Sequence, residues 1–156
     1  MRGCYFMNFK LLTILGLILL TLCSITAIHA DTYVIGNTSF SLDDGYALSE
    51  KGNNIMLYND DYVITLSEIP YANNNGLKRT LIKMGYNFVG ERNYTFDGVK
   101  INQQNYNNDG VNTCVYSFKK NGHNYVISLN LLENKTIPEY EDNPVTQIID
   151  TMQVEH

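Results

Sequence analysis

The 156-residue sequence has no tryptophan and only three residues each of cysteine, histidine and proline. Two of the cysteines, Cys4 and Cys23, fall within the first thirty residues, so Cys114 is the only one in residues 31–156. A single cysteine cannot form an internal disulfide, which excludes a disulfide-stapled fold for that part of the chain. Cys114 and His123, the only internal histidine there, also supply too few ligands for a zinc site.

Motifs of nucleotide and covalent chemistry are absent as well. The sequence has no glycine-rich phosphate loop and no nucleophile elbow of the serine hydrolases. Its carboxylates cluster in predicted turns or before a helix, and nothing places two of them at the separation that glycoside hydrolysis needs. We therefore predict that the protein is not an enzyme and has no cofactor or metal site. The clusters are Asp43-Asp44, Asp60-Asp61 and Glu139-Glu141-Asp142.

Basic residues are few. Arg2 and Lys10 account for two of the 11 Lys and Arg residues, which leaves 11 − 2 = 9 in residues 31–156 against all 16 Asp and Glu residues. The net charge of this part is therefore 9 − 16 = −7. An acidic domain of this kind is not expected to bind nucleic acid or anionic lipid through its bulk charge.

Residues 1–30 have the layout of a secretory signal peptide. Arg2 and Lys10 form a positive segment, an uncharged apolar run extends from Leu11 to Ile28, and the small residue Ala30 precedes the polar chain. Cleavage after Ala30 would release the remainder outside the cytoplasmic membrane. We therefore predict a secreted or extracytoplasmic protein.

The same apolar run leaves two alternatives open. Its 18 residues are just enough to span a bilayer, so an uncleaved N-terminal anchor would tether the domain to the membrane. Lipid attachment at Cys23 is the other alternative, although Leu22 stands where a small residue is expected. We expect contact with a membrane only through residues 1–30, and only if they are retained.

Three N-x-S/T sequons are candidate glycosylation sites, at Asn37, Asn93 and Asn134. They become substrates only in an organism that has an export-linked glycosylation machinery. In so asparagine-rich a chain, some sequons arise by chance.

Residues 31–156 are predicted to form a single α+β domain, with an antiparallel sheet of about six to seven strands and two short helices packed on it. Runs of β-prone residues are separated by turn signals at short intervals. The expected strands lie within Tyr33–Leu42 around a Gly36-Asn37 turn, at Asn54–Tyr58 and Tyr62–Ile69, at Tyr86–Phe96 and Val99–Tyr106 around Asp97-Gly98, and within Asn112–Leu132.

Two segments have helical periodicity. In Asn75–Met84 apolar residues recur at i, i+4 and i+7, with Asn74 or Asn75 as the expected N-cap and Gly85 after the end. Its basic side, which includes Lys78, is expected to face solvent. The second helix begins with Asn143 as N-cap and Pro144 at the first position, and its apolar stripe ends at Met152.

The segment Cys114–Asn130 (CVYSFKKNGHNYVISLN) predicts a hairpin with a definite register. A two-residue Asn121-Gly122 turn pairs Lys120 with His123 and, farther out, Cys114 with Leu129. Cys114 and His123 are then six positions apart along the ladder, about 20 Å, whereas a nucleophile and its base must lie within about 3 Å. They cannot form a dyad. We expect Cys114 to be buried and His123 to be solvated beside Lys120.

Two further features have both a functional and a structural interpretation. Asn105–Gly110 resembles the start of a calcium-binding loop, but Tyr116 stands where a bidentate glutamate is needed, so a turn is expected. Tyr46, Tyr71 and Tyr86 lie in or near loops and could stack on sugars, although tyrosines also serve as amphipathic residues at the rim of a sheet.

The order of elements and the segment SFSLDDGY resemble the PsbP/Mog1-like α/β/α sandwich family of small exported prokaryotic proteins. That family commonly opens with F-x-(I/L)-P-x-G-(F/Y); Phe40, Leu42, Gly45 and Tyr46 fit, but Asp43 replaces the proline. The resemblance extends in pattern from Thr38 to the final helix, NPVTQIIDTM. It implies a domain that acts by binding or assembly rather than catalysis, and it transfers no functional residue.

The leading hypothesis is therefore an exported, non-enzymatic domain that binds a protein or an envelope component. A structural cell-surface protein, self-associating and glycosylated, is the alternative. A small enzyme acting on envelope polymers is the third hypothesis, and it would require a cleft in which two or more carboxylates converge.

Overall fold

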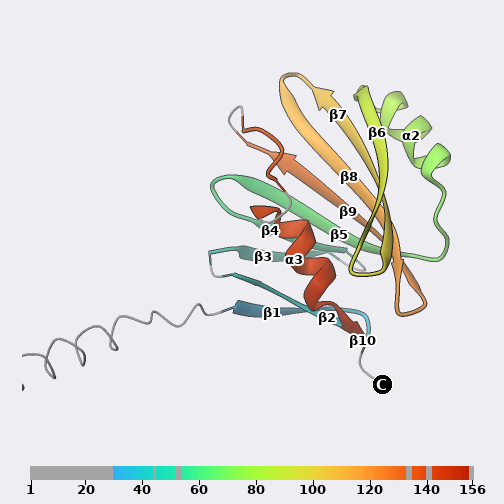
Figure 1. Ribbon diagram of the computed structural model, residues 1–156. Coiled ribbons are helices and arrows are strands. Elements are labelled where there is room, and N and C mark those ends of the chain that lie inside the picture. The colour runs from blue at the N-terminus through green and yellow to red at the C-terminus, as the bar shows by residue number, and fades with distance from the viewer. Residues whose placement is uncertain (1–29, 44, 52–53, 133–134, 140–141, 155–156) are drawn as a thin grey trace, which may run out of the picture.

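The computed structural model describes residues 30–43, 45–51, 54–132, 135–139 and 142–154 (Figure 1). These residues contain ten strands and two helices, which confirms the predicted α+β class. Among them, no helix is long and apolar enough to cross a membrane. In chain order the elements are β1 Ala30–Ile35, β2 Thr38–Asp43, β3 Ala47–Lys51, β4 Asn54–Tyr58, β5 Tyr62–Ile69, α2 Asn74–Lys83, β6 Asn87–Phe96, β7 Val99–Asn108, β8 Val111–Lys120, β9 His123–Leu131, α3 Pro144–Thr151 and β10 Gln153–Val154.

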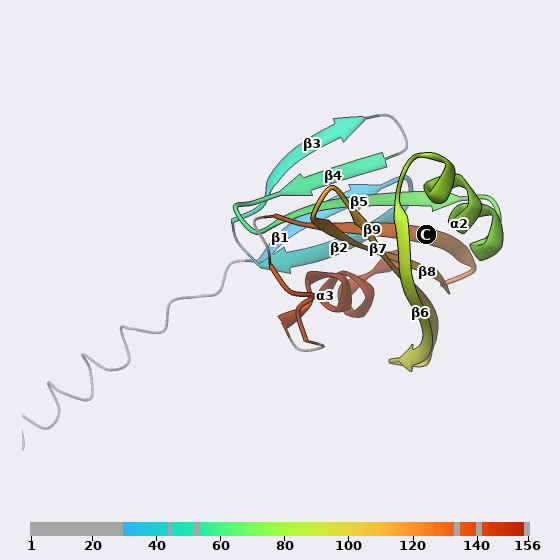
Figure 2. The same ribbon diagram turned by 90° about the horizontal axis from the view of Figure 1, so that it is seen from above.

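Seven strands form one antiparallel sheet in the order β3-β4-β5-β9-β8-β7-β6, with β3 and β6 at its opposite edges (Figure 2). Its three longest hairpins turn at Asp97-Gly98, Asp109-Gly110 and Asn121-Gly122, where both residues have positive φ. A type I′ turn requires this conformation, which asparagine, aspartate and glycine tolerate best. The hairpins predicted at Asp97-Gly98 and Asn121-Gly122 are confirmed, and Asn105–Gly110 is the end of β7 and the turn that follows it.

A second, three-stranded sheet has the order β1-β2-β10. The predicted Gly36-Asn37 turn joins β1 to β2, and Gly36 there has a φ of 57°. The sequence did not indicate that these strands would leave the main sheet, nor did it indicate β3 or β10. β10 is only two residues long, and β3 (ALSEK) lacks a regular alternation of apolar residues.

The main sheet, the small sheet and α3 enclose the hydrophobic core. Tyr116, Phe118, Tyr125, Ile127 and Leu129 point into it from β8 and β9, and each is at most 3% exposed. We call this side of the main sheet the core face. The predicted register of β8 and β9 is confirmed in every pair, from Lys120 with His123 to Cys114 with Leu129.

Helix α3 forms as predicted and packs on the core face. Asn143 caps it by accepting a hydrogen bond from the Val145 N–H at 3.0 Å, and the Asn143 amide donates to the Tyr116 hydroxyl at 3.0 Å. At the other end of α3, the Lys120 ammonium donates to the backbone carbonyl of Ile149. A cation at the C-terminal end of a helix interacts favourably with the helix dipole. The helix is thus tied to β8 at both ends.

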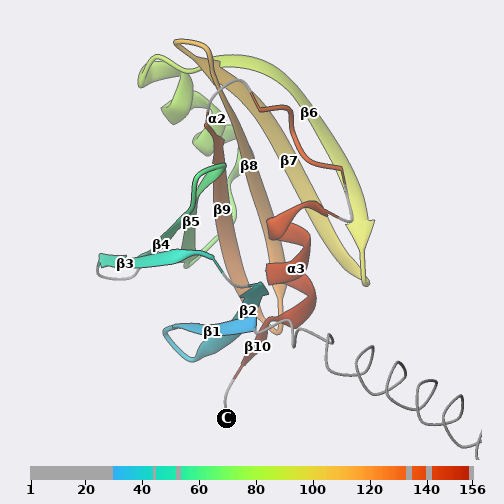
Figure 3. The same cartoon turned by 90° about the vertical axis from the view of Figure 1, so that its left-hand side faces the viewer.

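Helix α2 lies on the opposite face of the main sheet, which we call the open face (Figure 3). Ser117, the neighbour of Tyr116 on β8, points to α2 and donates a hydrogen bond to the Asn74 side chain at 2.6 Å. The N-cap is Asn73 rather than Asn74 or Asn75, because the Asn73 side chain accepts from the Gly76 N–H at 2.8 Å. The predicted apolar stripe is only partly covered, since no residue of α2 is buried and Met84 is 65% exposed.

The expectation that the basic side of α2 faces only solvent is wrong for one residue. The Lys78 ammonium lies 3.3 Å from the centroid of the Phe88 ring on β6. A cation over an aromatic face is attracted by the ring quadrupole. This contact helps to hold a helix whose apolar residues contribute little burial.

Candidate binding surface

Cys114 and His123 do not form a site. Cys114 is fully buried, and burial raises the pKa of its thiol from 9.0 to about 11, so the unreactive protonated form dominates at neutral pH. His123 was expected to be solvated beside Lys120, but its Nδ1 lies 2.7 Å from the Glu68 carboxylate on β5. The neighbouring strand β5 supplies this partner, which the hairpin sequence alone could not indicate.

The acidic clusters of the sequence remain on the surface. Asp43, Asp142 and Asp150 line a shallow hollow of about 570 Å³ beside α3. Asp142 precedes the N-cap of α3 and Asp150 lies in its last turn, so the two carboxylates are at opposite ends of the helix. Asp43 accepts a hydrogen bond from Gln147 at 2.8 Å. Within the described ranges, no three side chains of His, Cys, Asp or Glu are grouped so that they could hold a metal ion.

The remaining predicted acidic residues are more scattered. Asp61 pairs with Lys135 at 2.6 Å, and Asp60 lies beside it in the turn between β4 and β5. Glu139 borders a different hollow, next to Arg92. Asp44 and Glu141 lie outside the described residues.

The three candidate sugar-stacking tyrosines differ in exposure. Burial raises the pKa of half-buried Tyr46 to about 12, and Tyr86 packs edge-on against Tyr106 with ring centroids 6.2 Å apart. Tyr71 is 70% exposed. Of these three, Tyr71 is therefore the ring that a ligand could stack on without rearrangement.

Two of the three sequon asparagines can be placed. Asn37 is exposed in the turn between β1 and β2. Asn93 is exposed on β6, where its side-chain oxygen accepts a hydrogen bond from Asn102 at 3.0 Å. Asn134 lies outside the described residues. Asn93 also lines a hollow on the open face.

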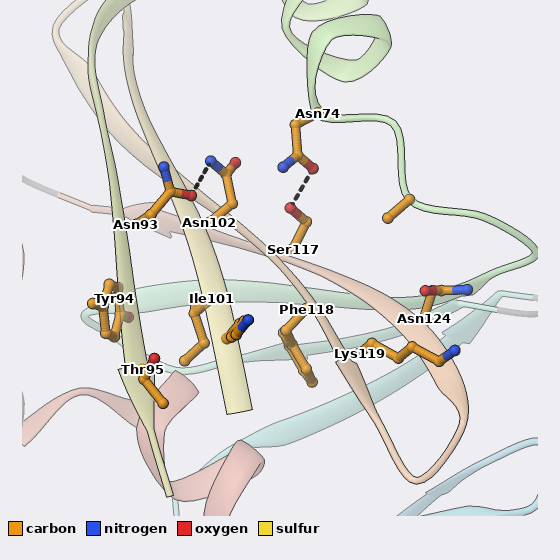
Figure 4. A pocket seen from close by; sticks show the side chains of 12 residues that line it. Asn74, Asn93, Tyr94, Thr95, Ile101, Asn102, Ser117, Phe118, Lys119 and Asn124 are labelled. Carbon is orange, nitrogen blue, oxygen red and sulfur yellow. Dashed lines mark hydrogen bonds between the residues drawn. The ribbon is translucent and has the colours of Figure 1, made fainter. Parts of the chain in front are cut away.

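Pairing of the strands places two successive rows of mainly polar side chains on the open face. One row crosses β6 to β8 through Asn93, Asn102 and Ser117, and the apolar Val126 continues it on β9. The next row, nearer the hairpin ends, contains Thr95 paired with Lys100 and Lys119 paired with Asn124. Together with α2 they border a hollow of about 520 Å³, which we call the polar hollow (Figure 4). It is lined by Ala72, Asn74, Asn93, Tyr94, Thr95, Lys100, Ile101, Asn102, Ser117, Phe118, Lys119 and Asn124.

Internal hydrogen bonds hold the floor of the polar hollow in place. Asn102, 7% exposed, donates to Asn93 at 3.0 Å and to the Glu91 carboxylate. Ser117, 5% exposed, donates to Asn74, and the two side chains point toward each other (Figure 4). In these bonds the side-chain oxygens of Asn93 and Asn74 are the acceptors. The amide N–H groups of both asparagines remain available as donors.

A second hollow adjoins the polar one on the other side of the Asn74–Ser117 contact. Its volume is about 440 Å³, and we call it the apolar hollow. The two share Asn74 and Ser117 and therefore lie side by side; we call them together the depression of the open face. The apolar hollow is lined by Ser67, Ile69, Pro70, Tyr71, Asn73, Asn74, Leu77, Ser117 and Val126.

Only a weak signal for this surface is present in the sequence. Alternation in β8 and β9 placed Ser117, Lys119 and Asn124 on one side, as expected for strands facing water. Asparagine was abundant throughout, so the asparagines of the hollow did not stand out. These side chains come together because β6 and β7 extend the same face of the sheet beside β8 and β9. The pairing of β7 with β8 joins two hairpins, so the register within one hairpin could not predict it.

Comparison with known proteins supports the architecture. No family model matches the sequence, and no curated protein matches it. Among solved structures, the fold is similar to the solution structure of cyanobacterial PsbP (CyanoP) from Synechocystis sp. PCC 6803, with a TM-score of 0.54 and 10% sequence identity. The match covers 84% of this chain and 95% of that chain. At this identity the likeness shows the fold alone, and on that basis the chain has the PsbP-like α+β fold that its sequence pattern suggested.

Proposed function

We propose that the protein is a non-enzymatic binding or assembly domain that acts outside the cytoplasmic membrane and binds a protein or envelope component through its open face. The observation that carries this proposal is the depression on that face. The apolar side of the main sheet is already covered on the core face, so the open face does not have to be covered for the sheet to be stable. Helix α2 covers only part of the open face and leaves the rest accessible. Polar side chains with fixed positions and spare hydrogen-bonding groups are typical of a recognition surface.

The proposed location rests on the sequence of residues 1–30, which has the features of a secretory signal or an N-terminal anchor. Intact-mass measurement of native protein from membrane and culture-supernatant fractions tests it. A chain that begins at Asp31 would support release, and added hexose mass would support use of the sequons. Retention of residues 1–30 in the membrane fraction would support a tethered protein instead.

The binding surface is tested by filling the polar hollow. Thr95→Trp places a large side chain in it from an exposed strand position, where aromatic residues are well accommodated. We expect this variant to lose co-sedimentation with envelope fragments of its own source. Val34→Trp is the matched control, because Val34 is 50% exposed on β1, outside the polar and apolar hollows. Equal binding by both variants would refute the assignment of the open face.

The alternative of a self-associating surface protein is favoured by one observation. Ile82, Met84 and Val89 are 48%, 65% and 68% exposed around the C-terminal end of α2 and the start of the edge strand β6. An edge strand offers unpaired backbone groups to another chain, although the irregular register between Phe88 and Gly90 interrupts this edge. Sedimentation of the protein over a range of concentrations would detect such association, and Val89→Lys should abolish it.

A further inference from the structure

We infer that the ligand of the open face is an acidic, hydroxyl-rich glycan, bound with its anionic groups at one end of the depression and a sugar ring at the other. This inference rests on the proposed binding function and names the chemistry of the ligand. Three features of the depression carry it: an unpaired pair of lysines, a lining of amides and hydroxyls, and an exposed tyrosine ring.

The lysines are Lys100 on β7 and Lys119 on β8. Both line the polar hollow, one position beyond the last pair of the β7–β8 ladder, which is Ile101 with Phe118. Both are exposed, and neither has an ion-pair partner among the residues that the structure describes. An anionic group bound in the polar hollow would therefore meet exposed cations that no described carboxylate neutralises.

The distribution of charge favours an anion at this place despite the acidic composition of the chain. No carboxylate lines either the polar or the apolar hollow. Asp43, Asp142 and Asp150 instead border the hollow beside α3, which packs on the core face. One carboxylate, that of Glu91, accepts a hydrogen bond from Asn102 in the floor of the polar hollow. The two lysines outweigh this single negative charge, so the hollow has a local excess of positive charge.

The lining between the lysines and Tyr71 matches a hydroxyl-rich ligand. Asn93 and Asn74 have spare amide N–H donors, and the Asn124 side chain donates to the Pro70 carbonyl at 3.3 Å, which leaves its oxygen as an acceptor. Thr95 adds a hydroxyl that both donates and accepts. Sugar hydroxyls likewise donate and accept, so each can satisfy such groups in either direction.

An acidic peptide fits this surface less well. The usual way for a sheet to bind an extended peptide is to add it as a strand along a free edge. Strands β7, β8 and β9, which carry most of the polar hollow, are paired on both sides. The exposed ring of Tyr71 at the apolar end instead offers a flat surface for the face of a sugar ring.

The test uses the purified full-length protein and three polymers. Polygalacturonic acid has carboxylates and hydroxyls, its fully methyl-esterified form has the same backbone without charge, and poly-L-glutamate has the charge without the hydroxyls. We expect measurable affinity, by calorimetry at low salt, for polygalacturonic acid in excess of both others. Equal binding of poly-L-glutamate would overturn the requirement for a glycan, and equal binding of the ester would overturn the role of the lysines.

Variants then locate the site. Lys100→Gln/Lys119→Gln should weaken binding of polygalacturonic acid by about tenfold, since two exposed ionic contacts are lost. Arg79→Gln/Lys83→Gln on α2 changes the net charge equally outside the two hollows and should leave binding unaltered. Equal weakening by both pairs would refute the site.

The ligand class and the proposed function can fail separately. If none of the three polymers binds while Thr95→Trp still abolishes co-sedimentation with envelope fragments, the open face binds something else and the glycan inference is wrong. If polygalacturonic acid binds and Thr95→Trp has no effect on either assay, the lysine pair binds anions outside the proposed surface, and both conclusions are overturned.

Discussion

Removal of one hydrogen bond should weaken the attachment of helix α2 to the open face. No residue of α2 is buried, and a ten-residue helix is not stable alone in water. Three polar contacts hold it: Ser117 donates to the Asn74 side chain at 2.6 Å, Gln104 donates to the Asn74 carbonyl at 3.3 Å, and Lys78 lies over Phe88. Ser117→Ala removes the shortest of these contacts and leaves the other two.

The expected size of the effect follows from the kind of bond. A hydrogen bond between neutral groups contributes about 0.5–1.5 kcal/mol net. If α2 opens locally, without global unfolding, its amide hydrogens exchange through that opening. A loss of about 1 kcal/mol then corresponds to about fivefold faster exchange for amides in α2. The amides of β8 and β9 should exchange at nearly the wild-type rate, because they exchange through global unfolding.

Hydrogen exchange followed by mass spectrometry measures both regions in one experiment. Ser128→Ala is the matched control, since Ser128 lies on the same face of β9 and has only a 3.4 Å contact with Asn130. We expect faster exchange in α2 for Ser117→Ala alone. If α2 keeps its wild-type exchange rate while β8 and β9 lose protection, the Ser117–Asn74 hydrogen bond does not hold α2 on the open face, and this reasoning is refuted.

Two further predictions concern the core face. Because burial raises the pKa of Cys114 from 9.0 to about 11, its contribution to stability is complete below pH 9 and is lost as the pH rises toward 11, by about 3 kcal/mol in total. A thiol reagent at pH 8 should label the protein only after unfolding in urea, and rapid labelling of the folded protein would contradict this. Tyr116→Phe leaves the Asn143 amide without its acceptor and should lower the free energy of unfolding by about 1–3 kcal/mol, whereas Tyr58→Phe, at a 45% exposed residue, should have little effect in the same urea titration.

Local signals in the sequence were sufficient for the hairpins and for α3. The turn Asn121-Gly122 and the alternation on both sides of it predicted a register that the structure confirms pair by pair. Asn143 and Pro144 likewise defined the start of α3, because capping and proline placement act within one turn. Each of these features depends on residues close together in the chain.

Features that depend on distant residues could not be predicted in this way. The separation of β1 and β2 into a second sheet depends on β10 and α3, for example through the Thr151 hydroxyl, which accepts from the Ser41 N–H at 2.9 Å. The Glu68–His123 pair joins side chains 55 residues apart. The N-cap of α2, predicted at Asn74 or Asn75, is Asn73, because any of three consecutive asparagines could cap the helix.

The polar hollow shows why a binding surface on a sheet is hard to recognise from sequence. A strand that faces water and a strand that faces a polar ligand alternate in the same way, so Ser117 and Lys119 fit both descriptions equally. The difference lies in how neighbouring strands are combined. Lys100 and Lys119 lie on different strands and line one hollow only because β7 pairs with β8. Neither has an ion-pair partner among the described residues, so the hollow contains two cations that no described carboxylate neutralises.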